Sequence, residues 1–275
     1  MPEHRTVILF SSHFISSPVT HELLKLERSC AGNYEVVFLY DNTRGDFKPA
    51  AKGKYHLFTL ESIAAAGYPL DKNVSPAENL WHHCDYPVLD YYLKNSAFDY
   101  YWKVEFDVRF VGEWSDFFDR FAHDESDFLA TEIKTYHSSP RWFWWDRLTP
   151  RVPLDRQVGC FFPVTRFSRN ALQVVHQAYR SGAEGHCEVV VPTILKNAGL
   201  SINDLGDKSY DRSTFGWDRY YRIKKGYLHH PVKNKRLGWV LTSALPVFVD
   251  NLKRKIMLRA RIRKALKIVS RWIRR

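Results

Sequence analysis

Two carboxylates stand two residues apart in the most β-rich run of the chain, residues 98–110 (FDYYWKVEFDVRF). Because side chains alternate along a strand, we expect Glu105 and Asp107 on the same side of a strand end. Convergent carboxylates in an apolar strand are costly to bury unless they are paired, protonated or bound to a cation. One or two carboxylates, together with substrate phosphates, are the usual ligands of Mg²⁺ or Mn²⁺. The alternative is that these acids face solvent or pair with Lys103 and Arg109.

The elements that must position these acids are typical of an α/β domain. Residues 6–12 (TVILFSS) form a continuous apolar run, as expected of a strand buried on both faces of a parallel sheet. A helix is predicted at residues 18–30 and a second strand at residues 34–40 (YEVVFLY). This β-α-β order predicts a doubly wound sheet, in which ligands bind at the carboxyl ends of the strands. Further helices are predicted at 61–67, 86–94, 113–123, 168–182 and 189–198, and further strands at 55–60, 127–134 and 158–164.

The run FDYYWKVEFDV (98–108) resembles a segment, YDYYWxxEYDV-like, of a group of bacterial and fungal glycosyltransferases. An ExD motif after an N-terminal β-α-β region is also similar to GT-A glycosyltransferases, whose DxD or ExD motif follows a nucleotide-binding half. The likeness covers residues 5–240 and is strongest at 98–112, 186–199 and 228–233. It implies a GT-A type (Rossmann-like), mixed and mostly parallel sheet flanked by helices.

By this resemblance, Asp107 and Glu105 contact a divalent cation, Mn²⁺ or Mg²⁺, and the diphosphate of a nucleotide-sugar donor. The nucleotide is expected beside polar residues that follow the first two predicted strands, which are Ser11, Ser12, His13, Asp41 and Asn42. Ordinary loop and capping chemistry is the alternative for residues 11–13.

Two later segments resemble further functional parts of GT-A enzymes. Glu188 leads into a predicted helix, at a position similar to that of the general base of inverting members. One carboxylate within reach of the acceptor hydroxyl suffices for that task, although an acid there also complements the helix dipole. The family often supplies a late histidine as a metal ligand. Adjacent histidines in a strand face opposite ways, so at most one of His229 and His230 is a ligand, and we favour His230. Lys233 could meet phosphate oxygens, and an incidental surface turn is the alternative for this segment.

An aromatic run, WFWW at residues 142–145, is predicted to be a loop or lid. Such a cluster could form a platform for a sugar ring or a lipid-linked acceptor, since aromatic rings bring a large apolar area. Aromatic clusters are also common in protein cores, and we assign no acceptor recognition to this one.

The positive charge of the chain is concentrated at its end. Residues 250–275 hold eleven of the 41 Lys and Arg residues and one of the 30 acids, so they carry ten of the eleven excess charges. Within 258–273, apolar residues recur at three- and four-residue steps and form one stripe, with basic residues between them. Such a C-terminal amphipathic helix is typical of an anionic membrane surface, where each basic residue adds roughly 1 kcal/mol. The expected membrane-binding residues are Arg259, Arg263, Lys264, Lys267, Arg271 and Trp272.

The same tail is also compatible with binding to nucleic acid, but the ordered apolar stripe and Trp272 favour a membrane. A hydrophobic content of 45% predicts a folded core, and no apolar run is long enough for a membrane span. The N-terminus has no signal-peptide pattern, so we expect a cytoplasmic protein, peripheral on the inner face of the cell membrane. Two parts are predicted, a GT-A-like catalytic domain at 1–245 and a basic helix at 246–275. The four scattered cysteines predict free thiols.

Together these features predict a glycosyltransferase that moves a sugar from a nucleotide-sugar donor to a lipid-linked or polysaccharide acceptor at the membrane. Inverting stereochemistry follows if Glu188 is the base. A basic-tailed nucleic-acid or anionic-lipid binding protein with an inactive GT-A-like body is the alternative. A nucleotidyltransferase or phosphohydrolase could use the same carboxylates, but the chain has no Gly-rich phosphate loop of the GxxxxGK[ST] or GxGxxG type.

Overall fold

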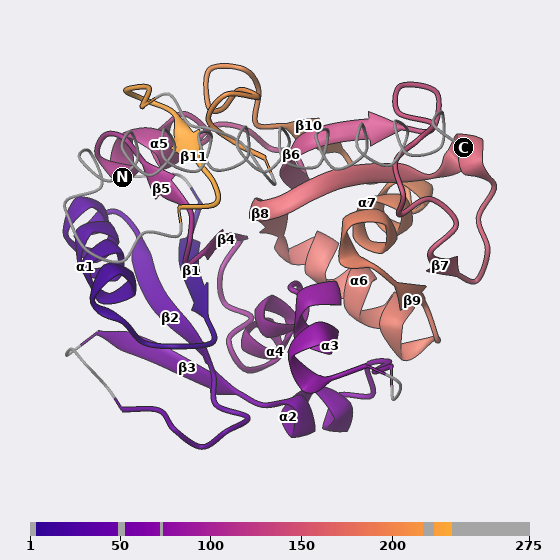
Figure 1. Ribbon diagram of the computed structural model, residues 1–275, viewed down its shortest axis with the longest axis horizontal. Helices are drawn as coiled ribbons and strands as arrows, with labels where there is room; N and C mark the ends of the chain where they lie inside the picture. Colours follow the sequence, from indigo (N-terminus) through magenta and orange to yellow (C-terminus); the bar gives the residue numbers. More distant parts are fainter. Residues whose placement is uncertain (1–3, 49–52, 72–73, 217–222, 233–275) are drawn as a thin grey trace, which may run out of the picture.

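The computed structural model describes residues 4–48, 53–71, 74–216 and 223–232 (Figure 1). The predicted boundary at residue 245, the basic helix with its six membrane-binding residues, and Lys233 lie outside the described residues. In the described part of the chain, no helix has the length and apolar character needed to cross a membrane.

A seven-stranded sheet forms the centre of the molecule (Figure 1). Its strands are β1 (Thr6–Ser12), β2 (Glu35–Asp41), β3 (Lys54–Phe58), β4 (Tyr100–Glu105), β6 (Phe128–Thr135), β8 (Val158–Ser168) and β10 (Ile202–Asp204). They lie in the order β10-β6-β8-β4-β1-β2-β3. β1 pairs in parallel with β2 and β4, and β2 with β3, whereas β8 is antiparallel to both β4 and β6. The sheet is therefore mixed and mostly parallel, and the β-α-β order at its start is Rossmann-like, as predicted.

Helices cover both faces of the sheet, because its central strands carry apolar side chains on both faces. The helices are α1 (Ser17–Cys30), α2 (Leu60–Ala65), α3 (Pro76–His82), α4 (Tyr86–Lys94), α5 (Trp114–Asp119), α6 (Arg169–Arg180) and α7 (Cys187–Asn197). In β4, Trp102 packs in the core cluster that contains α1 and α5. Its neighbour Tyr101 packs in the other cluster, with α4, α6 and α7. Figure 1 shows α6 and α7 lying beside β8.

The predicted β-rich run 98–110 is interrupted at the point where its acids stand. β4 ends at Glu105, and the next two residues form a turn before β5 (Arg109–Phe110). The Phe106 N–H donates to the Ser11 carbonyl (3.0 Å), and β5 pairs antiparallel with β11 (Leu228–His229). Asp107 is therefore held by a turn beside the end of β11, and not by a continuous strand.

A short strand pair and a 3-10 turn complete the described structure. β7 (Leu148–Thr149) pairs with β9 (Glu184–Gly185), and a 3-10 turn spans Leu154–Arg156. The β7–β9 pair joins the aromatic loop at 142–145 to the segment that enters α7. Four free cysteines, three of them buried, agree with the prediction of free thiols.

Candidate active site

Glu105, Asp107 and His230 come together beyond the carboxyl end of β4. Each residue offers one ligand atom, and these atoms lie within 4.8 Å of one another. Asp107 and His230 are 6% and 7% exposed, and His230 Nε2 lies 3.4 Å from Asp107 Oδ1. The Val232 N–H donates to the Asp107 carbonyl (2.7 Å), which fixes the segment after β11 against the turn. Residues far apart in the sequence thus converge as the predicted metal set requires.

Hydrogen bonds orient His230 toward the carboxylates. Its Nδ1 lies 3.2 Å from the Gly216 carbonyl, which accepts only, so Nδ1 carries the proton. The lone pair of Nε2 then faces a carboxylate oxygen, and these two electron pairs need a cation between them, either a proton or a metal ion. Carboxylate oxygens suit Mg²⁺ or Mn²⁺, and a neutral imidazole nitrogen is a common additional metal ligand, so the three residues fit the expected divalent ion.

His229 faces away from this cluster, as strand alternation predicts. It is fully buried, its Nε2 accepts the Lys224 N–H (3.2 Å), and its Nδ1 lies 3.0 Å from the Tyr227 carbonyl. Both ring nitrogens are thus held by backbone groups. The structure therefore supports His230, and not His229, as the ligand-competent member of the pair.

Lys103 and Arg109, the alternative partners of the acids, behave differently. The buried Lys103 Nζ donates to Glu105 Oε1 (2.5 Å) and to the Phe162 carbonyl (3.1 Å). Arg109 pairs instead with Glu22 (3.2 Å) and donates to the Phe106 and Val108 carbonyls, so it braces the turn. The alternative that the acids pair with Lys103 and Arg109 therefore holds for one carboxylate oxygen of Glu105, which accepts from Lys103.

Glu188 is the second residue of α7 and is only 4% exposed. Burial raises the pKa of Glu188 to about 8; Glu105 adds to the rise, whereas Lys134 and a hydrogen bond from the Phe162 backbone oppose it. Lys103 and Glu188 therefore both form a hydrogen bond with the backbone of Phe162. A carboxyl group whose pKa lies close to the working pH is well suited to general base catalysis.

The residues predicted beside the nucleotide gather at the same edge of the sheet. Ser11 pairs with Glu105 in the β1–β4 register. Burial lowers the pKa of His13, and Asp41, Asp107 and Glu105 are near enough to oppose this effect.

Three of these polar side chains are used in their own turns. Ser12 Oγ donates to the Phe14 carbonyl (2.7 Å), Asp41 accepts from the Thr43 N–H (2.9 Å), and Asn42 Oδ1 accepts from the Phe47 N–H (3.1 Å). Ser12 is therefore used in ordinary loop hydrogen bonding, as the alternative to nucleotide binding predicts. His13 instead lies near the carboxylates of Glu105 and Asp107.

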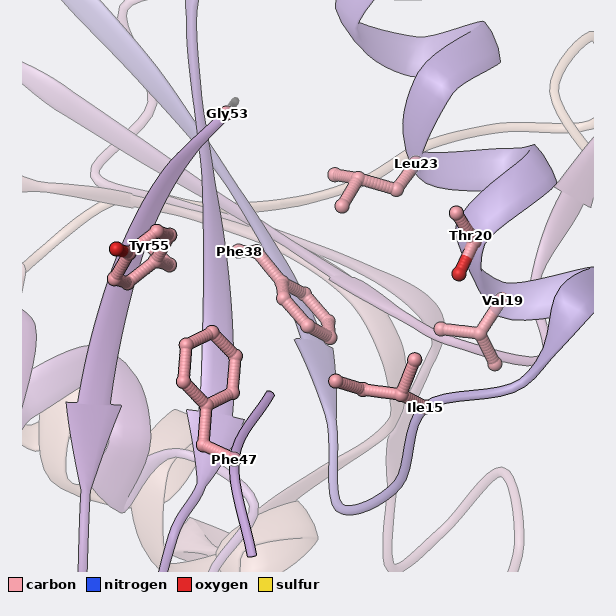
Figure 2. Close-up of a pocket in the computed structure, with 8 residues that line it drawn as sticks. All are labelled: Ile15, Val19, Thr20, Leu23, Phe38, Phe47, Gly53 and Tyr55. Atoms are coloured by element: carbon pink, nitrogen blue, oxygen red, sulfur yellow. The ribbon is translucent and has the colours of Figure 1, made fainter. Parts of the chain in front are cut away.

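A pocket on the α1 side of the sheet has a different character (Figure 2). It is lined by Ile15, Val19, Thr20, Leu23, Phe38, Phe47, Gly53 and Tyr55. These lining residues include no acid, histidine or lysine, and their side chains are apolar apart from two hydroxyl groups. Chemistry on a phosphate or a hydroxyl is therefore assigned to the carboxylate edge and not to this pocket.

Sequence reasoning missed two features beside Glu188. Lys134 on β6 acts on Glu188 electrostatically, lies 3.3 Å from Glu132 and stands over the Trp142 ring. Trp144 stacks on His186, the N-cap residue of α7, with ring centroids 3.8 Å apart. The WFWW run at 142–145 indicated an aromatic cluster. Its spacing did not indicate that Trp144 stacks on His186, which lies 42 positions later.

No protein-family model and no curated protein sequence matches the chain. Solved structures similar to it include the galactosyltransferase LgtC in complex with donor and acceptor sugar analogs. That match has 10% identity, covers 74% of each chain and has a TM-score of 0.43. Mouse xyloside xylosyltransferase 1, apo form, matches with 11% identity over 86% of this chain and 99% of that one, with a TM-score of 0.47.

Proposed function

We propose that this protein is a metal-assisted glycosyltransferase, which moves a sugar from a nucleotide-sugar donor to an acceptor hydroxyl. The observation that carries the proposal is the convergence of Glu105, Asp107 and His230 at the carboxyl edge of the sheet. The buried carboxyl group of Glu188 is electrostatically coupled to Glu105 and supports the same reading. Ligands of open α/β sheets bind at this edge.

Glu105, Asp107 and His230 would hold the divalent ion, Mn²⁺ or Mg²⁺. When bound, such an ion stabilises the negative charge that develops on a leaving diphosphate. Lys103 contributes by holding one Glu105 oxygen in place (2.5 Å) from a fully buried position. Lys233 is proposed to meet the phosphate oxygens, and the nucleotide is proposed to lie along Ser11, His13 and Asp41.

Glu188 is the proposed general base, which takes the proton from the acceptor hydroxyl as that oxygen attacks the donor sugar. Its raised pKa makes the carboxylate a stronger base than an exposed glutamate, and Lys134 stabilises the ionised form. Direct attack by the deprotonated hydroxyl inverts the configuration of the transferred sugar. We therefore propose an inverting reaction.

The acceptor is proposed to be lipid-linked or part of a growing polysaccharide at the cytoplasmic face of a membrane. The support is the cationic, amphipathic pattern of residues 250–275, which suits an anionic lipid surface. A sugar carried on a lipid would be presented to a catalytic domain held at that surface.

The test is a thermal-shift panel of UDP-, GDP-, CMP- and dTDP-linked ligands, each with and without Mn²⁺. A ligand that binds only the folded protein raises its melting temperature. We expect a metal-dependent shift with one nucleotide, lost in Asp107→Asn and kept in Asp116→Asn, a matched change of an exposed acid on α5. No shift with any ligand, in folded protein, would move the assignment to a binding protein with an inactive body.

A further inference from the structure

Four rings form an aromatic cluster beside Glu188: Trp81, His82, Trp144 and His186. Trp144 and His186 stack nearly in parallel, with centroids 3.8 Å apart and planes at 14°. Trp81 stands edge-on to His186 at 5.4 Å, and His82 stands at 5.4 Å from the same ring. α3, the loop at 142–145 and the start of α7 each contribute to the cluster, so its assembly depends on the tertiary fold.

The protonation of His186 follows from its surroundings. Burial, with additional effects of His82 and His83, lowers the pKa of His186 to about 3, so its ring is neutral at physiological pH. Its Nδ1 accepts the Glu188 backbone N–H (3.3 Å) and therefore carries no proton. The proton of the neutral ring is on Nε2, which makes Nε2 a hydrogen-bond donor.

Two donors of the aromatic cluster are left without acceptors. His186 Nε2 and Trp144 Nε1 are both buried, and neither has a hydrogen-bond partner among the described residues. A buried donor without a partner costs about 1–3 kcal/mol. Unsatisfied buried polar groups are rare in native proteins, so each one calls for an explanation, such as a functional role. The two N–H groups are neutral and donate only, so they can bind the hydroxyl and ring oxygens of a sugar.

Aromatic faces and neutral donors are together suited to a sugar ring, which presents C–H groups on its faces and oxygens at its rim. The cluster is also next to the proposed base, because His186 accepts the backbone N–H of Glu188. We propose that the aromatic cluster is the acceptor subsite and that its ligand is an uncharged sugar ring. This inference rests on the proposed function, and it defines the acceptor by its terminal sugar and not by its lipid.

Entry of the sugar requires a ring to move, since both donor nitrogens are buried in this structure. Of the four rings, Trp81 is the one with an exposed side chain. It is 46% exposed and stands near the end of the short helix α3, whereas His186 is 6% exposed and is fixed as a helix cap. A change in the Trp81 side chain would leave the cap of α7 in place, so Trp81 is the ring that we expect to move when the sugar enters.

The experiment measures binding of methyl glycosides of galactose, glucose, mannose, xylose and N-acetylglucosamine to the full chain by saturation-transfer NMR. Trp144→Phe keeps a ring for the stack but removes the unpartnered N–H. Trp145→Phe is the matched control, because its N–H already donates to the Ser139 carbonyl (2.8 Å). We expect at least one glycoside to bind. Its affinity should fall roughly fivefold to tenfold in Trp144→Phe, the effect of one lost neutral hydrogen bond, and stay unchanged in Trp145→Phe.

Failure of the acceptor subsite and failure of the proposed function give different results. Metal-dependent binding of a nucleotide, measured on the same variants, should be unaffected in Trp144→Phe. Nucleotide binding without any glycoside binding would refute the subsite alone. Glycoside binding that depends on Trp144, without metal-dependent nucleotide binding, would support a sugar site and refute the transferase. Equal weakening in both tryptophan variants, or preference for inorganic phosphate over every glycoside, would overturn the assignment.

Discussion

Replacing Glu188 with Gln should change how the stability of the protein depends on pH. In the unfolded chain this carboxyl group loses its proton near its ordinary pKa of 4.5, whereas in the folded protein burial raises the pKa to about 8. Between these values the folded state binds one proton more than the unfolded state, so the free energy of unfolding falls as the pH rises. The contribution of Glu188 to the free energy of unfolding is complete below the pKa of the unfolded state and is lost above the pKa of the folded state.

The magnitude follows from the size of the shift. One pKa unit corresponds to about 1.4 kcal/mol, so the contribution of Glu188 falls by about 4 kcal/mol between about pH 5 and about pH 9. Glutamine has a similar shape and does not titrate. The Glu188→Gln variant should therefore be close to the wild type in stability at the lower pH and more stable at the higher pH by about that amount.

Urea denaturation of both proteins at these pH values measures the difference, since the free energy of unfolding falls linearly with urea concentration. Glu184→Gln, a change of an exposed acid just before α7, is the control and should show no such trend. If the difference between wild type and Glu188→Gln is the same at both pH values, burial does not hold this carboxyl group protonated. Glu188 is then not a base with a raised pKa.

Three further predictions concern separate parts of the chain. Lys103→Met removes the buried partner of Glu105 and of the Phe162 carbonyl, so the free energy of unfolding measured in urea should fall by about 2–4 kcal/mol. Lys94→Met, which removes a half-exposed ammonium group that pairs with the buried Asp90, should cost less than about 1 kcal/mol. Diamide should oxidise Cys84 and Cys187 to a disulfide, because their sulfur atoms are 3.4 Å apart, and peptide mapping detects this product. A disulfide that instead contains Cys30 or Cys160 would contradict the packing of Cys84 against Cys187. Deletion of residues 250–275 should abolish sedimentation of the protein with vesicles that contain phosphatidylserine and leave its melting temperature unchanged. Sedimentation that persists in the deletion variant would refute membrane binding by these residues.

The proximity of Glu105 and Asp107 could be predicted from their two-residue spacing at the end of a strand, and their role as metal ligands stays a prediction. Strand alternation correctly separated His229 from His230, since β11 places His229 in a buried backbone-bonded position. The turn that carries Asp107 was not predictable from propensity. Residues 98–110 are rich in aromatic and β-branched side chains, which favour a strand. The interruption depends on the pairing of β5 with β11 and on a hydrogen bond to the Ser11 carbonyl.

The surroundings of Glu188 were harder to predict for a similar reason. Its position at the start of α7 follows from local helix signals, but its burial depends on Phe162, Lys134 and the aromatic loop, which are distant in sequence. The pairing of Trp144 with His186 is a tertiary contact between a loop and a helix cap. Neither residue has a periodic pattern that indicates its partner.

The most direct test of the central claim is release of nucleoside diphosphate from a panel of nucleotide sugars, with and without Mn²⁺, using the full chain. We predict slow release from one donor, only with the metal ion, and faster release when a sugar acceptor is added. Asp107→Asn and His230→Ala should abolish the reaction, and Asp116→Asn should not change it. Release that is independent of metal and equal in Asp107→Asn, or no release from any donor by folded protein, would contradict the account.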